Sequence, residues 1–205
     1  MRIALADKPS RVDLILGYKE LGADMDELFG VSGENPRMAV FGYVGTNKLE
    51  DLLKGQGDEF EKGVAILFHL LGLDVVHYGS LPGEIPDVVA LFKVNKWILV
   101  IECAGRELDT RDKLSKLITR SREIGDSIPD YKIYPVIATS LPSRVIGRGD
   151  MEKAAKDSII VITNDEVLDL LQVAFEGITE DELLGRLLRL VPAGGNPWGL
   201  GGLSQ

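Results

Sequence analysis

The sequence has little of what secreted, membrane-spanning or nucleotide-dependent proteins contain. One cysteine, Cys103, occurs in 205 residues, which excludes an internal disulfide and favours the cytoplasm. No run of about 18 apolar residues is present, so we expect no membrane span. The first residues lack the basic start and apolar centre of a secretory signal. An unrelated small-molecule α/β enzyme is a further alternative, but the sequence has no phosphate-binding glycine motif to support it.

Histidine and positive charge are also scarce. The two histidines, His69 and His77, lack metal-ligand spacing, and we expect them to be packing or surface residues. Lysine and arginine number 23 against 32 acidic residues, a net charge of −9 that argues against a protein coating polyanions. Residues 104–148 nevertheless hold nine basic and six acidic residues, so they carry +3 and the remainder −12. A phosphate backbone would favour this stretch, although a solvated helix face explains the same count.

What is present is typical of a globular domain, with 45% hydrophobic and 27% charged residues. We expect an N-terminal extension or small subdomain over 1–57, a core domain over 58–192 and a glycine-rich tail over 193–205. In the extension, 2–6 and 38–44 resemble strands and 23–29 resembles a helix. Apolar spacing in the core predicts helices and strands in this order: helix 58–72, strands 74–78, 86–92 and 97–103, helix 109–124, strands 132–138 and 158–162, helices 165–175 and 180–190.

This order predicts an α/β fold with a mixed central sheet. The central strands are apolar on both faces, so we expect helices to cover both faces of that sheet. The glycines at 147 and 149 predict a turn, with a flexible loop that touches a backbone phosphate as the alternative.

Two carboxylates become neighbours when residues 87–92 and 97–103 are paired as a hairpin. Paired positions then sum to 189, which sets Asp87 opposite Glu102 on one face of the hairpin. Two ionised acids side by side would repel each other, and a divalent cation with oxygen ligands is the simplest neutralising partner. The alternative is that each acid is solvated at an exposed hairpin end or faces a basic residue.

These strands and their flanking helices resemble a known family. The segment "IPDVVALF…ILVIECAG", preceded by "DEFEKGVAILFHLLGLDVV", resembles the PD-(D/E)xK nuclease superfamily, particularly its restriction-endonuclease-like and Holliday-junction-resolvase-like members. The resemblance covers about 59–162. It implies a restriction-endonuclease-like core of helix, three strands, helix and strand. It also implies Asp87 and Glu102 as metal ligands, the Cys103 backbone carbonyl as a further ligand, and Glu61 as an acid that holds metal through water. A solvated residue in the first turn of its helix is the alternative for Glu61.

The family's lysine is missing from its usual place, two residues after the second acid, where Ala104 stands. Cys103 cannot replace it because that side chain points to the opposite face, and we expect a core cysteine there. The segment "ECAGRELDTRDKLSKLITR" is similar to a variant in which the next helix supplies a displaced lysine and an arginine. That similarity implies Lys113, or secondly Lys116, as the catalytic lysine. Both fall in one helical stripe with Arg120, a stripe that equally suits cations bordering an amphipathic helix.

The resulting prediction is a cytoplasmic, Mg²⁺- or Mn²⁺-dependent nuclease that hydrolyses DNA phosphodiester bonds, with an endonuclease favoured. Arg120, Arg111 and Arg106 are its expected DNA contacts. Because cutting a duplex needs two active sites, we expect a homodimer. The alternative is a catalytically inactive module that retains the fold for DNA binding or protein assembly, which would account for Ala104.

Overall fold

The computed structural model describes residues 49–78, 85–92, 94–105, 107–108 and 112–195. The strands expected at 2–6 and 38–44, the helix expected at 23–29 and most of the glycine-rich tail therefore lie outside the described residues. No helix in the described ranges has the length and apolar character needed to cross a membrane.

The described elements follow the predicted order closely. They are α4 (Asp58–Leu70), β1 (Asp74–His77), β2 (Val88–Phe92), β3 (Trp97–Ala104), α5 (Lys113–Ser127), β4 (Lys132–Thr139), the short 3-10 helix η2 (Ser143–Val145), α6 (Arg148–Lys156), β5 (Ile160–Ile162), α7 (Asn164–Glu176) and α8 (Glu180–Leu188). Residues 49–54 form a further helical segment before α4.

The expectation of a turn at 147–149 is wrong, because α6 begins at Arg148 with Gly147 as its N-cap residue. The helix has nine residues, and its fully buried residues are the two alanines Ala154 and Ala155. Such a small apolar surface gives a weak periodic signal, so the two glycines dominated the prediction.

The sheet has five strands in the order β1-β2-β3-β4-β5. Strands β1, β2 and β3 pair antiparallel, whereas β3, β4 and β5 pair parallel, which confirms the predicted mixed sheet. Val89 pairs with Val100 and Leu91 with Ile98, so the predicted register between β2 and β3 is confirmed. Continued by one position, this register sets Asp87, just before β2, opposite Glu102.

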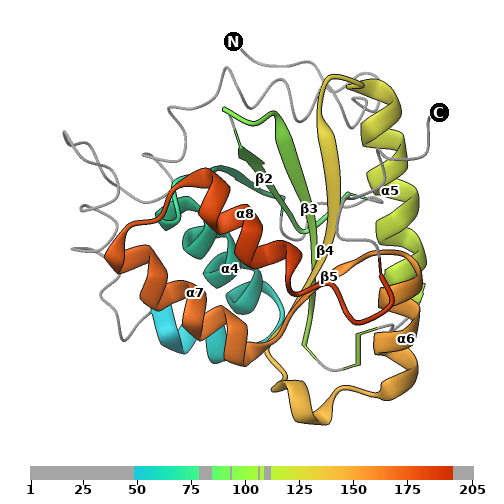
Figure 1. Ribbon diagram of the computed structural model, residues 1–205. Helices are drawn as coiled ribbons and strands as arrows, with labels where there is room; N and C mark the ends of the chain where they lie inside the picture. The colour runs from blue at the N-terminus through green and yellow to red at the C-terminus, as the bar shows by residue number, and fades with distance from the viewer. Residues whose placement is uncertain (1–48, 79–84, 93, 106, 109–111, 196–205) are drawn as a thin grey trace, which may run out of the picture.

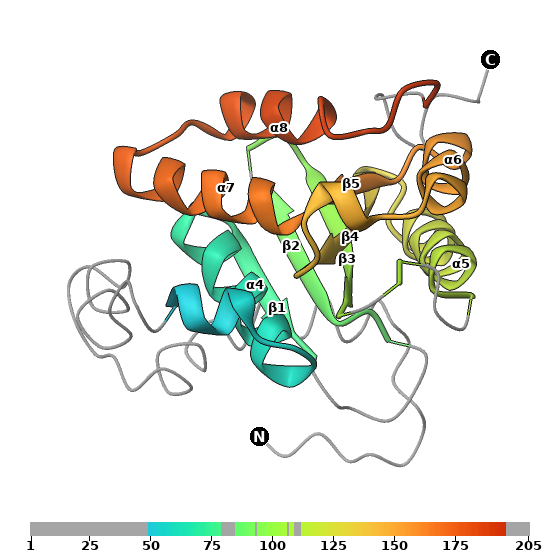
Figure 2. The same cartoon turned by 90° about the horizontal axis from the view of Figure 1, so that it is seen from below.

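Helices cover both faces of the sheet, as predicted. Figures 1 and 2 show α4, α7 and α8 on one face and α5 and α6 on the other. Alternate strand residues feed two separate cores: Ala90 and Ile101 point toward α4, whereas Val89 and Val100 point toward α5. Burial on both faces explains why the central strands are continuously apolar.

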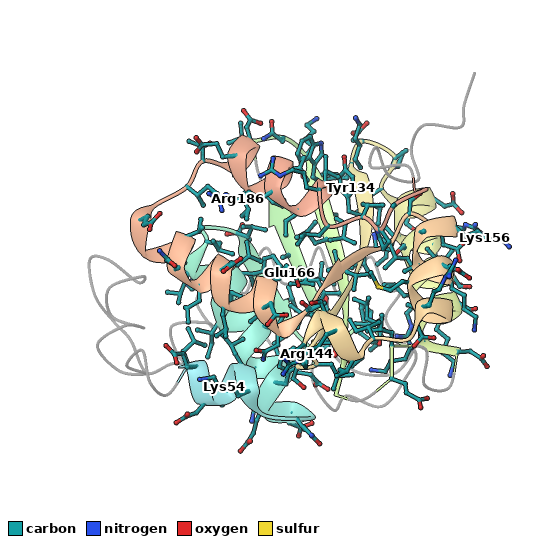
Figure 3. The ribbon with its side chains drawn as sticks, turned by 60° about the horizontal axis from the view of Figure 1, so that its bottom comes forward. Lys54, Tyr134, Arg144, Lys156, Glu166 and Arg186 are labelled. Carbon is teal, nitrogen blue, oxygen red and sulfur yellow. The ribbon has the colours of Figure 1, made fainter. Side chains whose placement is uncertain are left out.

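Two local features fix the α4 side of the sheet. Residues 49–54 pack against α4, where a Cβ added at Gly63 would come within 3.1 Å of Leu52 and Leu53 side-chain atoms. At the start of α7, Thr163 and Glu166 form a reciprocal capping box, and Figure 3 labels that glutamate. The cap satisfies backbone N–H groups that would otherwise lack partners at the helix start.

Candidate active site

The two predicted acids meet around one ammonium group. Lys113 Nζ lies 3.6 Å from Asp87 Oδ2 and 3.7 Å from Glu102 Oε2. Glu102, near the C-terminal end of β3, is 3% exposed, and the Asp87 side chain is 17% exposed. The carboxylates are therefore not solvated, but each faces a basic residue, which was one of the two alternatives to a metal site.

Backbone hydrogen bonds hold Asp87 in place. Its Oδ2 accepts a hydrogen bond from the Cys103 N–H at 2.7 Å, and its carbonyl accepts one from Tyr78 N–H at 3.0 Å. Burial raises the pKa of Asp87 above its usual value, although Lys113 and the Cys103 N–H partly offset this effect. The charge of Glu61 raises the pKa of Asp87 further. An added cation would therefore stabilise the ionised carboxylate.

Cys103 contributes its backbone rather than its thiol. Its carbonyl oxygen accepts a hydrogen bond from Lys113 Nζ, so this oxygen joins the two carboxylates around the ammonium group. The side chain is buried in the α4-side core, on the opposite face, as expected. Burial raises the pKa of the thiol well above its usual value, and the nearby Asp87 charge adds to that shift. A thiol in this setting stays protonated and is a poor nucleophile.

Arg120 neutralises the second acid from the same helix. It lies about two turns after Lys113, on the same side of α5, and donates a hydrogen bond to Glu102 Oε1. The residue is only 9% exposed. Its expected contact with a DNA phosphate remains a prediction. A phosphate that contacts Arg120 would have to approach the buried carboxylate of Glu102.

The remaining predicted cations are placed differently. Lys116 is exposed on α5, whereas Lys113 and Arg120 make the ion pairs with the acids. Arg106 and Arg111 lie outside the described residues. Arg144 and Arg148 are exposed in the connection from β4 into α6, and Figure 3 labels Arg144 there.

Glu61 has a partner that sequence reasoning missed. His77 Nε2 lies 3.7 Å from Glu61 Oε2, with the side chains 13% and 15% exposed. His77 is thus a packed residue, as expected, but the Glu61 carboxylate beside it was not expected. His77 ends β1, and the next residue bonds to the Asp87 carbonyl. The pairing of β1 with β2 was the signal that could have placed this histidine near the acids.

A shallow cavity of about 390 Å³ adjoins the site between the ends of β3 and β4 and the start of α6. Gly105, Leu108 and Ile146 contribute to its lining, together with the acidic side chains of Glu107 and Asp150. These two carboxylates make the cavity unsuitable for a phosphate group.

The ligand set fits a hard divalent cation. The ammonium of Lys113 stands where three oxygens converge: two carboxylates and one carbonyl. Mg²⁺ prefers oxygen ligands and needs only one or two protein carboxylates, because it keeps several waters. Within the described ranges, no three His, Cys, Asp or Glu side chains cluster as a metal site. A metal here would therefore depend on the backbone carbonyl and water besides the two acids.

Comparisons with known proteins identify the fold. No family model and no curated protein matches the sequence. The structure is similar to the small subunit of the heterodimeric restriction endonuclease R.BspD6I, with a TM-score of 0.58 and 14% identity over 74% of this chain and 89% of that one. It is also similar to the restriction endonuclease FokI, with a TM-score of 0.52 and 10% identity over 77% of this chain and 34% of that one. The chain thus has a restriction-endonuclease-like fold.

Proposed function

We propose that the protein is a divalent-metal-dependent nuclease that hydrolyses DNA phosphodiester bonds, most readily as an endonuclease. The observation that carries this proposal is the convergence of Asp87, Glu102 and the Cys103 carbonyl on one cation position. This convergence occurs in a fold shared with two restriction endonucleases.

In this proposal Asp87, Glu102 and the Cys103 carbonyl hold Mg²⁺ or Mn²⁺, and Glu61 holds it through water. Such an ion polarises a phosphoryl oxygen and lowers the pKa of a bound water. The protein's own part is to exclude bulk solvent and fix the oxygens. The 3% exposure of Glu102 and the hydrogen bond to Asp87 support that part.

Lys113 is the proposed catalytic lysine, displaced from the slot that Ala104 occupies. It begins α5, yet its ammonium reaches the carbonyl of Cys103, the residue before Ala104. The group thus lies close to where a lysine at position 104 would place it. With a metal bound, the ammonium would move aside to a position next to the ion, where it can orient the attacking water and stabilise charge that develops on the phosphate. Lys116 is the second choice, because it is exposed and lies away from these ion pairs.

DNA and a second copy of the chain are the proposed partners. Arg144 and Arg148, two of the nine basic residues of the segment 104–148, are exposed, and Arg106 and Arg111 belong to the same segment. Cutting both strands of a duplex needs two active sites, which favours a two-fold homodimer. Light scattering at assay concentration tests this part, and a monomer would contradict it.

One observation favours the alternative of a catalytically inactive module. Lys113 and Arg120 bring two positive charges to the two acids, so the carboxylates are balanced without any metal. In an inactive descendant this arrangement would be permanent. The site would then serve stability, while the fold binds DNA or assembles with proteins.

Incubation with plasmid, linear and branched DNA in Mg²⁺, Mn²⁺ and EDTA separates the two functions. The proposed enzyme cuts at least one of these substrates in the presence of a metal and none in EDTA. Absence of cleavage under all conditions, together with no calorimetric binding of Mg²⁺ or Mn²⁺, would favour the inactive module.

A further inference from the structure

We propose that His77 and Glu61 bind a first-row transition-metal ion, at a second cation position on the α4 side of Asp87. The inference rests on the proposed function only in treating this end of the sheet as metal-binding. It assigns a ligand role to a histidine whose sequence position indicated none.

The separation of the two side chains suits a bridging ion better than a direct bond. His77 Nε2 and Glu61 Oε2 are 3.7 Å apart, whereas an N–H···O hydrogen bond spans about 2.7–3.2 Å. Metal–nitrogen and metal–oxygen bonds are each about 2.0–2.2 Å long. Their sum exceeds 3.7 Å, so a single ion could bond to both atoms at their present separation.

Burial leaves the imidazole nitrogen in need of a partner. Within the described residues, His77 Nε2 is inaccessible to solvent and has no hydrogen-bond partner. Buried polar atoms normally have one, because water can no longer serve them. A metal ion would satisfy the nitrogen and the Glu61 carboxylate together.

The charges around the pair also favour a cation. Glu61 lies beside His77, and the residue after His77 donates a hydrogen bond to the Asp87 carbonyl, so two acidic residues lie at this end of the sheet. Lys113 and Arg120 contact Asp87 and Glu102 from α5, on the opposite face of the sheet. A second positive charge beside Glu61 would relieve the repulsion between Glu61 and Asp87.

The ligand types select the class of metal. Asp87, Glu102 and a carbonyl present only oxygen and suit Mg²⁺. An imidazole nitrogen adds preference for transition metals, whose affinity for nitrogen ligands rises along the first row. The Glu61–His77 position should therefore bind Mn²⁺, and Zn²⁺ more tightly, in preference to Mg²⁺.

Mn²⁺ is the probe for the test, because pulsed electron paramagnetic resonance detects nitrogen bound directly to it. The untagged full chain contains only two histidines, so His69 is a matched control. It lies eight residues after Glu61 on α4, about 12 Å along the helix. We expect coupling to a histidine nitrogen in the wild-type protein, shown by its change on ¹⁵N-histidine labelling.

The coupling should persist in His69→Gln and disappear in His77→Gln, with Mn²⁺ affinity about tenfold weaker in the latter. Unchanged coupling in His77→Gln would overturn the proposal. So would its absence from Mn²⁺-loaded wild-type protein, a measurement that needs no substitution to fold. If Mg²⁺-dependent DNA cleavage then proceeds without that coupling, the inference alone fails. Coupling without any cleavage would remove the proposed function and support the second cation position.

Discussion

Lys113, in the first turn of α5, donates a hydrogen bond to the carbonyl oxygen of Cys103, ten residues earlier in the chain. The same ammonium lies 3.6 Å from Asp87 and 3.7 Å from Glu102. It therefore occupies the position at which these three oxygens would hold a metal ion. In the proposed function, lysine and metal would compete for one set of ligands, and the lysine would withdraw when a metal binds.

This competition predicts opposite effects of one substitution on binding and on catalysis. Lys113→Ala should tighten Mg²⁺ binding by at least about tenfold, because it removes a competing positive charge whose interaction at about 4 Å lies between about 1 and 4 kcal/mol. The same change should abolish cleavage. Calorimetric titration and a plasmid-nicking assay measure the two effects.

Lys116→Ala is the control on the same helix. This exposed residue should leave metal affinity and cleavage nearly unchanged. If Lys116→Ala proves inactive and Lys113→Ala active, the displaced lysine is Lys116. Full activity of the double variant would show that neither side chain is catalytic.

The stability of the protein should depend on pH and metal through Asp87. Its folded pKa is raised, chiefly by burial, so the folded chain holds this proton more tightly than the unfolded chain does. The contribution of Asp87 to stability therefore falls as pH rises from its unfolded pKa through its folded pKa. Above that window the ionised carboxylate opposes folding, and Asp87→Asn should melt at a higher temperature than the metal-free wild type.

Metal should reverse this order. Mg²⁺ at one hundred times its dissociation constant stabilises the wild type by about 2.7 kcal/mol, whereas Asp87→Asn should gain little. Thermal melts at pH 7 with Mg²⁺ and with EDTA measure both differences. Equal gains in the two proteins would mean that Asp87 does not bind the ion.

Arg120 should be far more important for folding than its place on a charged helix suggests. Arg120→Ala leaves Glu102, 3% exposed, without its guanidinium partner, and breaking such a buried pair costs about 3–5 kcal/mol. Arg122→Ala, two residues along α5 and exposed, should change stability by less than about 0.5 kcal/mol. Urea denaturation compares them, and a similar small loss in both would show that Lys113 alone neutralises Glu102.

The Cys103 thiol should be chemically inert in the native protein. Burial raises its pKa well above the usual value, so the reactive thiolate is rare at neutral pH. A thiol reagent should label the chain rapidly only after denaturation, and Cys103→Ala should retain cleavage. Rapid labelling of the native protein would contradict this assignment.

The core of this fold was predictable from two regularities, the alternation of side chains along the strands and the 3.6-residue period of the helices. Alternation along β2 and β3 gave both the faces and the register, and Asp87 and Glu102 followed from that register without any tertiary information. Lys113 was predicted from the resemblance to a family variant, because the 3.6-residue period of α5 places Lys113, Lys116 and Arg120 in one stripe without selecting either lysine.

The partners of these residues were not predictable in the same way. Arg120 was expected to contact DNA, yet the structure buries it against Glu102, because how far a helix face tilts toward the sheet depends on packing. Predicting the contact of His77 with Glu61 would have required the pairing of β1 with β2 and the position of α4. Both bring together residues that are far apart in the chain. Short helices such as α6, with two buried alanines, leave too little periodicity to detect.

The most direct test of the metal-dependent nuclease is the nicking rate of supercoiled plasmid by wild type and Asp87→Asn, side by side in Mg²⁺. Asn at position 87 can still accept the hydrogen bond from the Cys103 N–H, so the variant should fold while losing a charged metal ligand. The account predicts nicking by the wild type, none in EDTA, and a loss of at least about a hundredfold in the variant. Equal rates for the two proteins, or no nicking by the wild type, would contradict it.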